Sequence, residues 1–159
     1  LLTIGAVRIE GRRIKTSSRL ELLIKPDASI DVEAIKVHHL RHIDVENGLP
    51  PRRALHAFLE FIGSRPLVGY YLEFDVAMIN KYLRPWLGVA LPNRQIEVSS
   101  LYYDYVQRKY RGHPWIGNVD LRFDRILEAL ELPVRPAHDA CNDALMTAMM
   151  YLKLRELAD

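Results

Sequence analysis

Two short acidic segments contain the residue types in this chain that could do chemistry. In Leu67–Asp75, an apolar run suited to a buried strand leads into a helix, so Asp75 follows the C-terminal end of the strand. Open α/β sheets bind their ligands at that edge. In the second segment, Ala137–Ala144, His138 and Asp143 stand at the start of the last predicted helix. An unpaired carboxylate beside an apolar helix face would be costly to bury, which favours a metal or a cationic partner for Asp143.

The spacing of His138 and Asp143 restricts how they could act together. Five residues turn an α-helix by about 140°, so the two side chains do not share a helix face. They can cooperate only if His138 stands on the preceding loop, and Pro136 favours an irregular approach there. Asp139 is better interpreted as the N-cap of this helix than as a ligand. An N-cap is also the alternative interpretation of Asp75.

Strands and helices alternate along the chain around these segments. An apolar stripe on the last helix is expected to pack on the core; its members are Cys141, Ala144, Leu145, Ala148, Met149 and Leu152. The expected elements are a hairpin of strands Leu1–Ile9 and Leu20–Ile24 around a turn at Glu10–Arg13, a helix over Pro51–Ile62, a strand over Pro66–Tyr70, a helix over Phe74–Leu83, a weak strand over Arg94–Val98, a helix capped by Ser99 and continuing to Arg108, a helix over Leu121–Leu130 and the last helix over Asp139–Leu157. We therefore predict an α/β fold with a mixed β-sheet flanked by α-helices.

Composition limits the class of protein. The 159 residues, 49% hydrophobic and 26% charged, fit one domain with one sizeable core. A formal charge of +2 is too balanced to identify a nucleic-acid partner. The single cysteine, Cys141, and the absence of an N-terminal signal pattern favour a reducing cytoplasm, and no apolar run approaches the roughly 20 residues that span a bilayer.

The two acidic segments resemble the second and third motifs of the DnaQ-like 3′→5′ exonucleases, in the branch of the DEDD superfamily that uses a catalytic histidine. The matching residues are Phe74-Asp75 and His138-Asp139-Ala140-Cys141-Asn142-Asp143-Ala144. The resemblance extends to Ile4-Gly5-Ala6-Val7, which is similar to the second strand of the family, and to Val37-His38-His39-Leu40. It implies a ribonuclease H-like fold and hydrolysis of phosphodiester bonds at the 3′ end of single-stranded or frayed DNA, or of RNA.

The same resemblance implies roles for individual residues. Two Mg²⁺ or Mn²⁺ ions would stabilise charge on the attacking and leaving oxygens. Asp143 and Asp75 would be metal ligands and His138 the general base. A polymerase subunit is a further partner that the resemblance suggests.

Two departures from the family pattern carry expectations of their own. The first motif, Asp-x-Glu on a central strand, should precede Leu1, so we expect the natural protein to extend upstream. A chain that starts at Leu1 should be aggregation-prone or partly unfolded, and should bind Mg²⁺ or Mn²⁺ weakly. If the chain is active as it stands, Glu73 is the nearest carboxylate that could complete the site. The second departure is Tyr70-Tyr71, where many relatives have His-Asn; a tyrosine there could stack on a base or sugar.

Three alternatives remain open from the sequence. A non-catalytic module that binds nucleic acid or a polymerase would keep the fold without the first motif. His38 and His42 could bind zinc from one helix face, although no further ligand is spaced nearby. The cationic and aromatic segment Arg108–Trp115 could bind single-stranded nucleic acid, or could be a solvated loop with Trp115 in the core.

Overall fold

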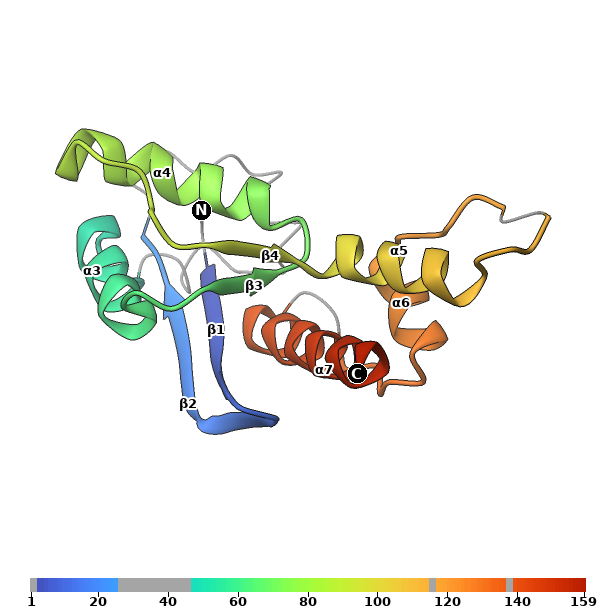
Figure 1. Cartoon of the computed structure of the whole chain (residues 1–159). Helices are drawn as coiled ribbons and strands as arrows, with labels where there is room; N and C mark the ends of the chain where they lie inside the picture. The colour runs from blue at the N-terminus through green and yellow to red at the C-terminus, as the bar shows by residue number, and fades with distance from the viewer. Residues whose placement is uncertain (1–2, 26–46, 115–116, 137–138) are drawn as a thin grey trace.

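The N-terminal half of the molecule is built on a β-hairpin. The computed structural model describes residues 3–25, 47–114, 117–136 and 139–159 (Figure 1). Strands β1 (Thr3–Glu10) and β2 (Arg13–Leu23) pair antiparallel, with a register shift between Val7 and Arg8. The predicted hairpin is confirmed, and β2 begins directly after the turn instead of at Leu20 because Arg13, Ile14 and Lys15 already pair with β1.

A second, parallel pair of strands alternates with two helices. The order is α3 (Pro51–Ile62), β3 (Leu67–Gly69), α4 (Leu72–Leu87) and β4 (Gln95–Glu97), with β3 parallel to β4. Pro51 occupies the start of α3, where a missing N–H costs nothing. The α/β class is confirmed. The described strands form one antiparallel and one parallel pair, where the sequence predicts a single mixed sheet, because β1 and β3 share no ladder.

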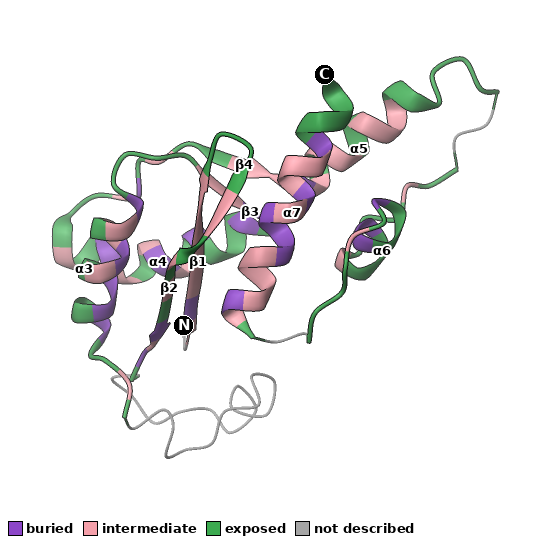
Figure 2. Cartoon of the chain, turned by 90° about the horizontal axis from the view of Figure 1, so that it is seen from below, coloured by how far each residue is buried: buried purple, intermediate pink, exposed green. Residues whose placement is uncertain are grey.

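Three further helices complete the described chain. Helix α5 (Val98–Lys109) continues directly from β4, α6 (Phe123–Ala129) follows a loop, and α7 (Ala140–Ala158) ends the chain. Figures 1 and 2 show α3 and α4 at one end of the molecule and α5 and α6 at the other, with α7 between them. Among the described residues there is no helix long and apolar enough to cross a membrane.

Two clusters of buried side chains hold these elements together. The first joins the hairpin to α3 and α4 through Ile4, Leu22, Ile24, Ala54, Leu55, Phe58, Ile62, Leu72, Val76, Ile79, Leu83 and Leu91. The second joins α5, α6 and α7 through Val98, Ile126, Leu127, Leu130, Met146, Met150 and Leu154. The parallel strands connect the two clusters, since Leu67 packs against the first and Val68 against the second. This connection places the ends of β3 and β4 between the two halves.

Helix α7 is buried on more than one side, which the single predicted stripe did not anticipate. Met146, Met150 and Leu154 are its most deeply buried large side chains, whereas the predicted Ala144, Leu145, Met149 and Leu152 are half-buried. Its N-terminal end lies against β1: a Cβ on Gly5 would overlap the carbonyl group of Ala140 and lie 2.6 Å from the Cys141 nitrogen. The predicted stripe is confirmed at Cys141 and Ala148, which are buried, but it is incomplete because α7 packs on the hairpin and on α5 and α6 at once.

Candidate active site at the starts of two helices

The first predicted acidic residue lies in the first turn of α4. Asp75 is exposed and follows β3 through a tight connection of Tyr70 and Tyr71. Gly69 is the last residue of β3, and a Cβ there would come within 2.7 Å of the Leu72 side chain, so the tight connection favours glycine at this position. Tyr71, the N-cap residue of α4, has φ 53° and ψ 36°, a left-handed conformation rare outside glycine, and makes no side-chain cap hydrogen bond. The local sequence therefore does not cap this helix.

Glu97 caps α4 from the neighbouring strand. Its two carboxylate oxygens accept hydrogen bonds from the backbone N–H of Tyr71 at 3.2 Å and of Leu72 at 3.0 Å. The same carboxylate accepts from the N–H and the hydroxyl of Ser99, at 3.2 and 2.7 Å, and so is also the N-cap of α5. The prediction that Ser99 caps α5 is wrong: Ser99 donates, and the longer Glu97 side chain reaches both helices.

The position of Glu97 affects the electrostatics of Asp75. Burial raises the pKa of the Asp75 carboxyl above its ordinary value, and the negative charge of Glu97 raises it further. Since the Asp75 residue is exposed overall, solvent screens both effects. A cation bound beside these carboxylates would oppose both effects, because it favours the ionised form of a neighbouring acid.

The second acidic residue, Asp143, lies in the first turn of α7. The helix begins at Ala140, and the Asp139 side chain accepts a hydrogen bond from the Asn142 N–H at 2.9 Å, which confirms Asp139 as the N-cap. The Asp143 N–H donates to the Asp139 carbonyl at 2.9 Å, and the Asp143 carbonyl accepts from the Thr147 hydroxyl at 2.8 Å. Asp143 is half-buried. Its backbone is therefore fixed by ordinary helix geometry.

The structure describes two of the three predicted site residues. Asp75 and Asp143 each lie in the first turn of a helix, while His138 precedes α7 and lies outside the described residues. The described ranges contain no group of three or more His, Cys, Asp or Glu residues placed to hold a metal. His38 and His42, the alternative zinc pair, also lie outside the described residues. Glu73 is exposed and lines a shallow pocket with Lys81 and Arg84.

Sequence reasoning missed Glu97 although a usable signal was present. Glu97 is the last residue of β4, beside β3 in a parallel pair. The rule that drew attention to Asp75, that ligand-binding groups follow parallel strands at their C-terminal ends, applies equally to Glu97.

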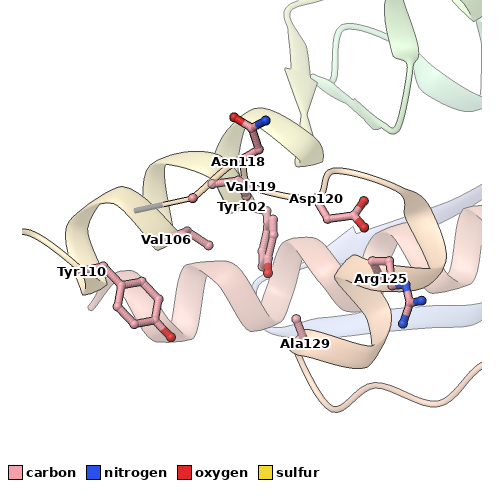
Figure 3. A pocket seen from close by; sticks show the side chains of 9 residues that line it. Tyr102, Val106, Tyr110, Asn118, Val119, Asp120, Arg125 and Ala129 are labelled. Carbon is pink, nitrogen blue, oxygen red and sulfur yellow. The ribbon is translucent and has the colours of Figure 1, made fainter. Parts of the chain in front are cut away.

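A separate pocket of about 400 Å³ lies between α5, α6 and the chain that leads into α6 (Figure 3). Its lining includes Tyr102 on α5 and Tyr110 directly after α5, with Asp120 and Arg125 on the other side. Hydrogen bonds from Arg122 lower the pKa of the Asp120 carboxyl to about 2. Of the two predicted site residues that the structure describes, neither Asp75 nor Asp143 lines this pocket, so it does not mark the acidic site.

The cationic and aromatic segment Arg108–Trp115 begins in the last turn of α5 and is described only up to Pro114. The Lys109 ammonium lies 5.6 Å from the ring centres of both Tyr105 and Tyr110, and the Tyr110 ring packs edge-on against His113. Trp115, on which the alternative interpretation depends, lies outside the described residues. Nucleic-acid binding by this segment stays a prediction.

Comparison with known proteins gives a consistent result. The family model RNase_T, described as "Exonuclease", matches residues 1–151. The chain is 26% identical over 156 residues to the DNA polymerase III subunit epsilon of Aquifex aeolicus, covering 98% of this chain and 72% of that protein. It is 27% identical over 154 residues to the same subunit of Haemophilus influenzae, covering 97% and 58%. The chain spans only 11% of the PolC-type DNA polymerase III of Thermotoga maritima, at 24% identity over 157 residues.

Solved structures share the fold. One is exonuclease X in complex with 5′ overhanging duplex DNA, with a TM-score of 0.70, 18% identity, and coverage of 98% of this chain and 82% of the other. Another is cell-death related nuclease 4, with a TM-score of 0.66, 14% identity, and coverage of 91% and 52%. At these identities, the likeness shows the ribonuclease H-like fold of exonucleases.

Proposed function

The chain belongs to the exonuclease family RNase_T, and we propose that it is a metal-dependent 3′→5′ exonuclease that releases nucleoside 5′-monophosphates from single-stranded or frayed DNA or from RNA. One observation carries this proposal: Asp75 and Asp143 both stand in the first turns of helices, within the segment that the family model matches. The DNA polymerase III subunits among the relatives support DNA as substrate and a polymerase subunit as partner.

The donor chemistry of the site fits a hard divalent cation. Asp75 and Asp143 offer carboxylate oxygens, which Mg²⁺ and Mn²⁺ prefer, and Asp75 is open to solvent. When bound, two such ions would activate the attacking water and stabilise the charge that develops on the phosphate and the leaving oxygen. We propose Asp75 and Asp143 as residues that hold them.

The role that we propose for His138 is transfer of the proton of the attacking water. We propose that an imidazole nitrogen of His138 accepts the proton of the attacking water. The water oxygen forms a bond to the phosphorus of the terminal nucleotide, the bond from that phosphorus to the preceding O3′ breaks, and the leaving O3′ takes up a proton from solvent. The products are a nucleoside 5′-monophosphate and a strand one nucleotide shorter with a new 3′ hydroxyl.

We further propose that an Asp-x-Glu strand supplies the other carboxylates of the site. Helix α7 contacts both β1 and β3, which belong to separate ladders among the described strands. A strand between β1 and β3 would join the two ladders into the mixed sheet that the fold class predicts. On this proposal residues 1–159 are part of one exonuclease domain. The buried free thiol of Cys141 supports a reducing, cytoplasmic setting.

The test uses the full-length natural protein and an internally labelled oligonucleotide of DNA or RNA. We expect hydrolysis with Mg²⁺ or Mn²⁺, none after chelation, arrest when the 3′ hydroxyl is blocked and no effect of a 5′ block. Nucleoside 5′-monophosphates should be the chromatographic products. Internal cleavage would contradict the polarity, and binding without hydrolysis would favour a non-catalytic module.

A further inference from the structure

Two neighbouring tyrosines at the end of β3 have opposite environments. The Tyr70 hydroxyl donates a hydrogen bond to the Leu121 carbonyl at 2.9 Å, and its ring packs edge-on against Phe123 with 5.1 Å between ring centres. Tyr71 is 70% exposed. The Tyr70 ring therefore fixes the β3–α4 connection to the start of α6, whereas most of the Tyr71 ring faces solvent.

The backbone at Tyr71 is held in a conformation that tyrosine rarely adopts. A left-handed residue with a large side chain is strained and persists only where its surroundings determine it. Here the surroundings are specific: one Glu97 oxygen accepts from the Tyr71 N–H, and the other accepts from the Leu72 N–H. The Tyr70 and Tyr71 rings pack in a T-shaped arrangement, with 5.1 Å between their centres.

The exposed ring of Tyr71 lies at the same helix start as Asp75. Tyr71 is the N-cap of α4, and Asp75 lies in the first turn of the same helix. Phe74, between them in the chain, is also 66% exposed. Large exposed aromatic side chains are the groups on which unpaired bases stack, because every base presents a π-face.

We propose that Tyr71 is a stacking platform for a base at the 3′ end of the substrate, and that Glu97 is the positioning residue that holds the platform beside Asp75. This inference rests on the proposed function, because it assumes that a nucleic-acid end reaches Asp75. The platform selects unpaired over paired ends, since a base must leave its duplex partner to lie on the ring.

Binding is the direct test. Full-length protein in an Asp143→Asn background, which prevents degradation, is titrated with an oligonucleotide carrying 2-aminopurine at its 3′ end. Stacking quenches the fluorescence of this base. Tyr71→Phe keeps the ring and should bind within about 3-fold of the parent, whereas Tyr71→Asn should weaken binding roughly 5- to 150-fold and abolish the quenching.

Asparagine removes the aromatic ring but tolerates the left-handed backbone conformation. Tyr71→Asn should therefore fold with an unchanged or higher Tm. Tyr103→Ala is the matched control, since Tyr103 is 44% exposed on α5. It should leave affinity and quenching unchanged. Equal quenching in the parent and in Tyr71→Asn would overturn the platform, as would an equal loss in Tyr71→Phe.

A double-mutant cycle tests the role of Glu97. Glu97→Gln replaces one accepting oxygen by an NH₂ group and should weaken binding and quenching while the Tyr71 ring is present. If Glu97 acts through Tyr71, adding Glu97→Gln to Tyr71→Asn should cost no further affinity. Additive losses would overturn the positioning role.

The proposed function and the platform can fail separately. In hydrolysis by the protein without the Asp143→Asn change, Tyr71→Asn should raise KM by the factor lost in binding and leave kcat within about 3-fold. Robust hydrolysis with no effect of Tyr71→Asn would overturn the platform alone. Quenching that depends on Tyr71 without any hydrolysis would overturn the exonuclease activity and support the platform.

Discussion

Helices α4 and α7 both present an aspartate in their first turn, but they begin by different means. At α7, the side chain of Asp139 accepts a hydrogen bond from the N–H of Asn142, three residues later in the chain, as the local sequence predicts. At α4, Tyr71 supplies no cap, and Glu97, from another strand, accepts the leading N–H groups. One carboxylate of the site is thus placed by local sequence and the other by a tertiary contact.

The difference predicts where the proposed site is most sensitive to mutation. Among the described residues, the start of α7 is stabilised by the Asp139 cap and depends on the space beside Gly5. The start of α4 depends on β3 and β4 remaining paired, because their pairing places Glu97 beside Tyr71.

Both aspartates should be equally necessary for chemistry despite their different origins. In the full-length protein, Asp143→Asn or Asp75→Asn should each lower kcat by about 10³-fold or more, because each removes an anionic ligand from metal ions that contribute several kcal/mol to the transition state. The assay is release of 3′-terminal nucleotides, with Tm as the folding control. Undiminished turnover in either variant would remove that residue from the site.

His138 should act as the general base that works with the proposed metal ligand Asp143 on α7. His138→Ala should lower kcat by roughly 10²- to 10⁴-fold. A base works only when deprotonated, so the wild-type rate should fall as the pH drops through the imidazole pKa, and His138→Ala should lack this acidic limb. A pH–rate profile of both proteins measures it; an identical profile would assign the base to another group.

The space beside Gly5 should be required for the start of α7. Gly5→Ala places a methyl group against the Ala140 carbonyl, a backbone group that cannot change rotamer. We expect a loss of about 1–3 kcal/mol in the free energy of unfolding, measured in urea, with reduced activity. Gly11→Asn is the control: Gly11 has open space around it and a φ of +60° that asparagine tolerates. Equal stability of Gly5→Ala and wild type would contradict the close packing.

The local cap of α7 should contribute less than the packing beside Gly5. Asp139→Ala removes the acceptor for the Asn142 N–H and should lower the free energy of unfolding by about 1 kcal/mol. Asp139→Asn keeps a capping oxygen and should stay close to wild type in the same urea titration. Similar losses in both variants would point to a role of the Asp139 charge beyond capping.

The smallest effect concerns stability at the start of α4. Because burial and Glu97 raise the pKa of Asp75 in the folded protein, the ionised carboxyl destabilises the metal-free fold above that pKa. Asp75→Asn should therefore raise the Tm at pH 7 by about 1–3 °C. The gain should vanish as the pH falls through the raised pKa, since the wild-type carboxyl is then also neutral. A lower Tm for Asp75→Asn at pH 7 would contradict the repulsion.

The sequence alone determined the features that depend on neighbouring residues. The spacing of Leu55, Phe58 and Ile62 predicted α3 within the bounds observed, and the order of Asp139 and Asp143 predicted an N-cap followed by a first-turn carboxylate. Helix periodicity and capping act over a few residues, so they can be read directly from the chain.

Only the tertiary structure decided which groups meet at the start of α4. Glu97 and Tyr71 are distant in sequence, and their contact exists because β3 and β4 lie parallel and end at the same edge. Tyr70 and Tyr71 are adjacent in the sequence, which likewise gives no indication that Tyr70 packs on Phe123 while the Tyr71 ring is exposed. Such contacts depend on strand pairing and helix packing across the whole chain, and neither is encoded in a short window of residues.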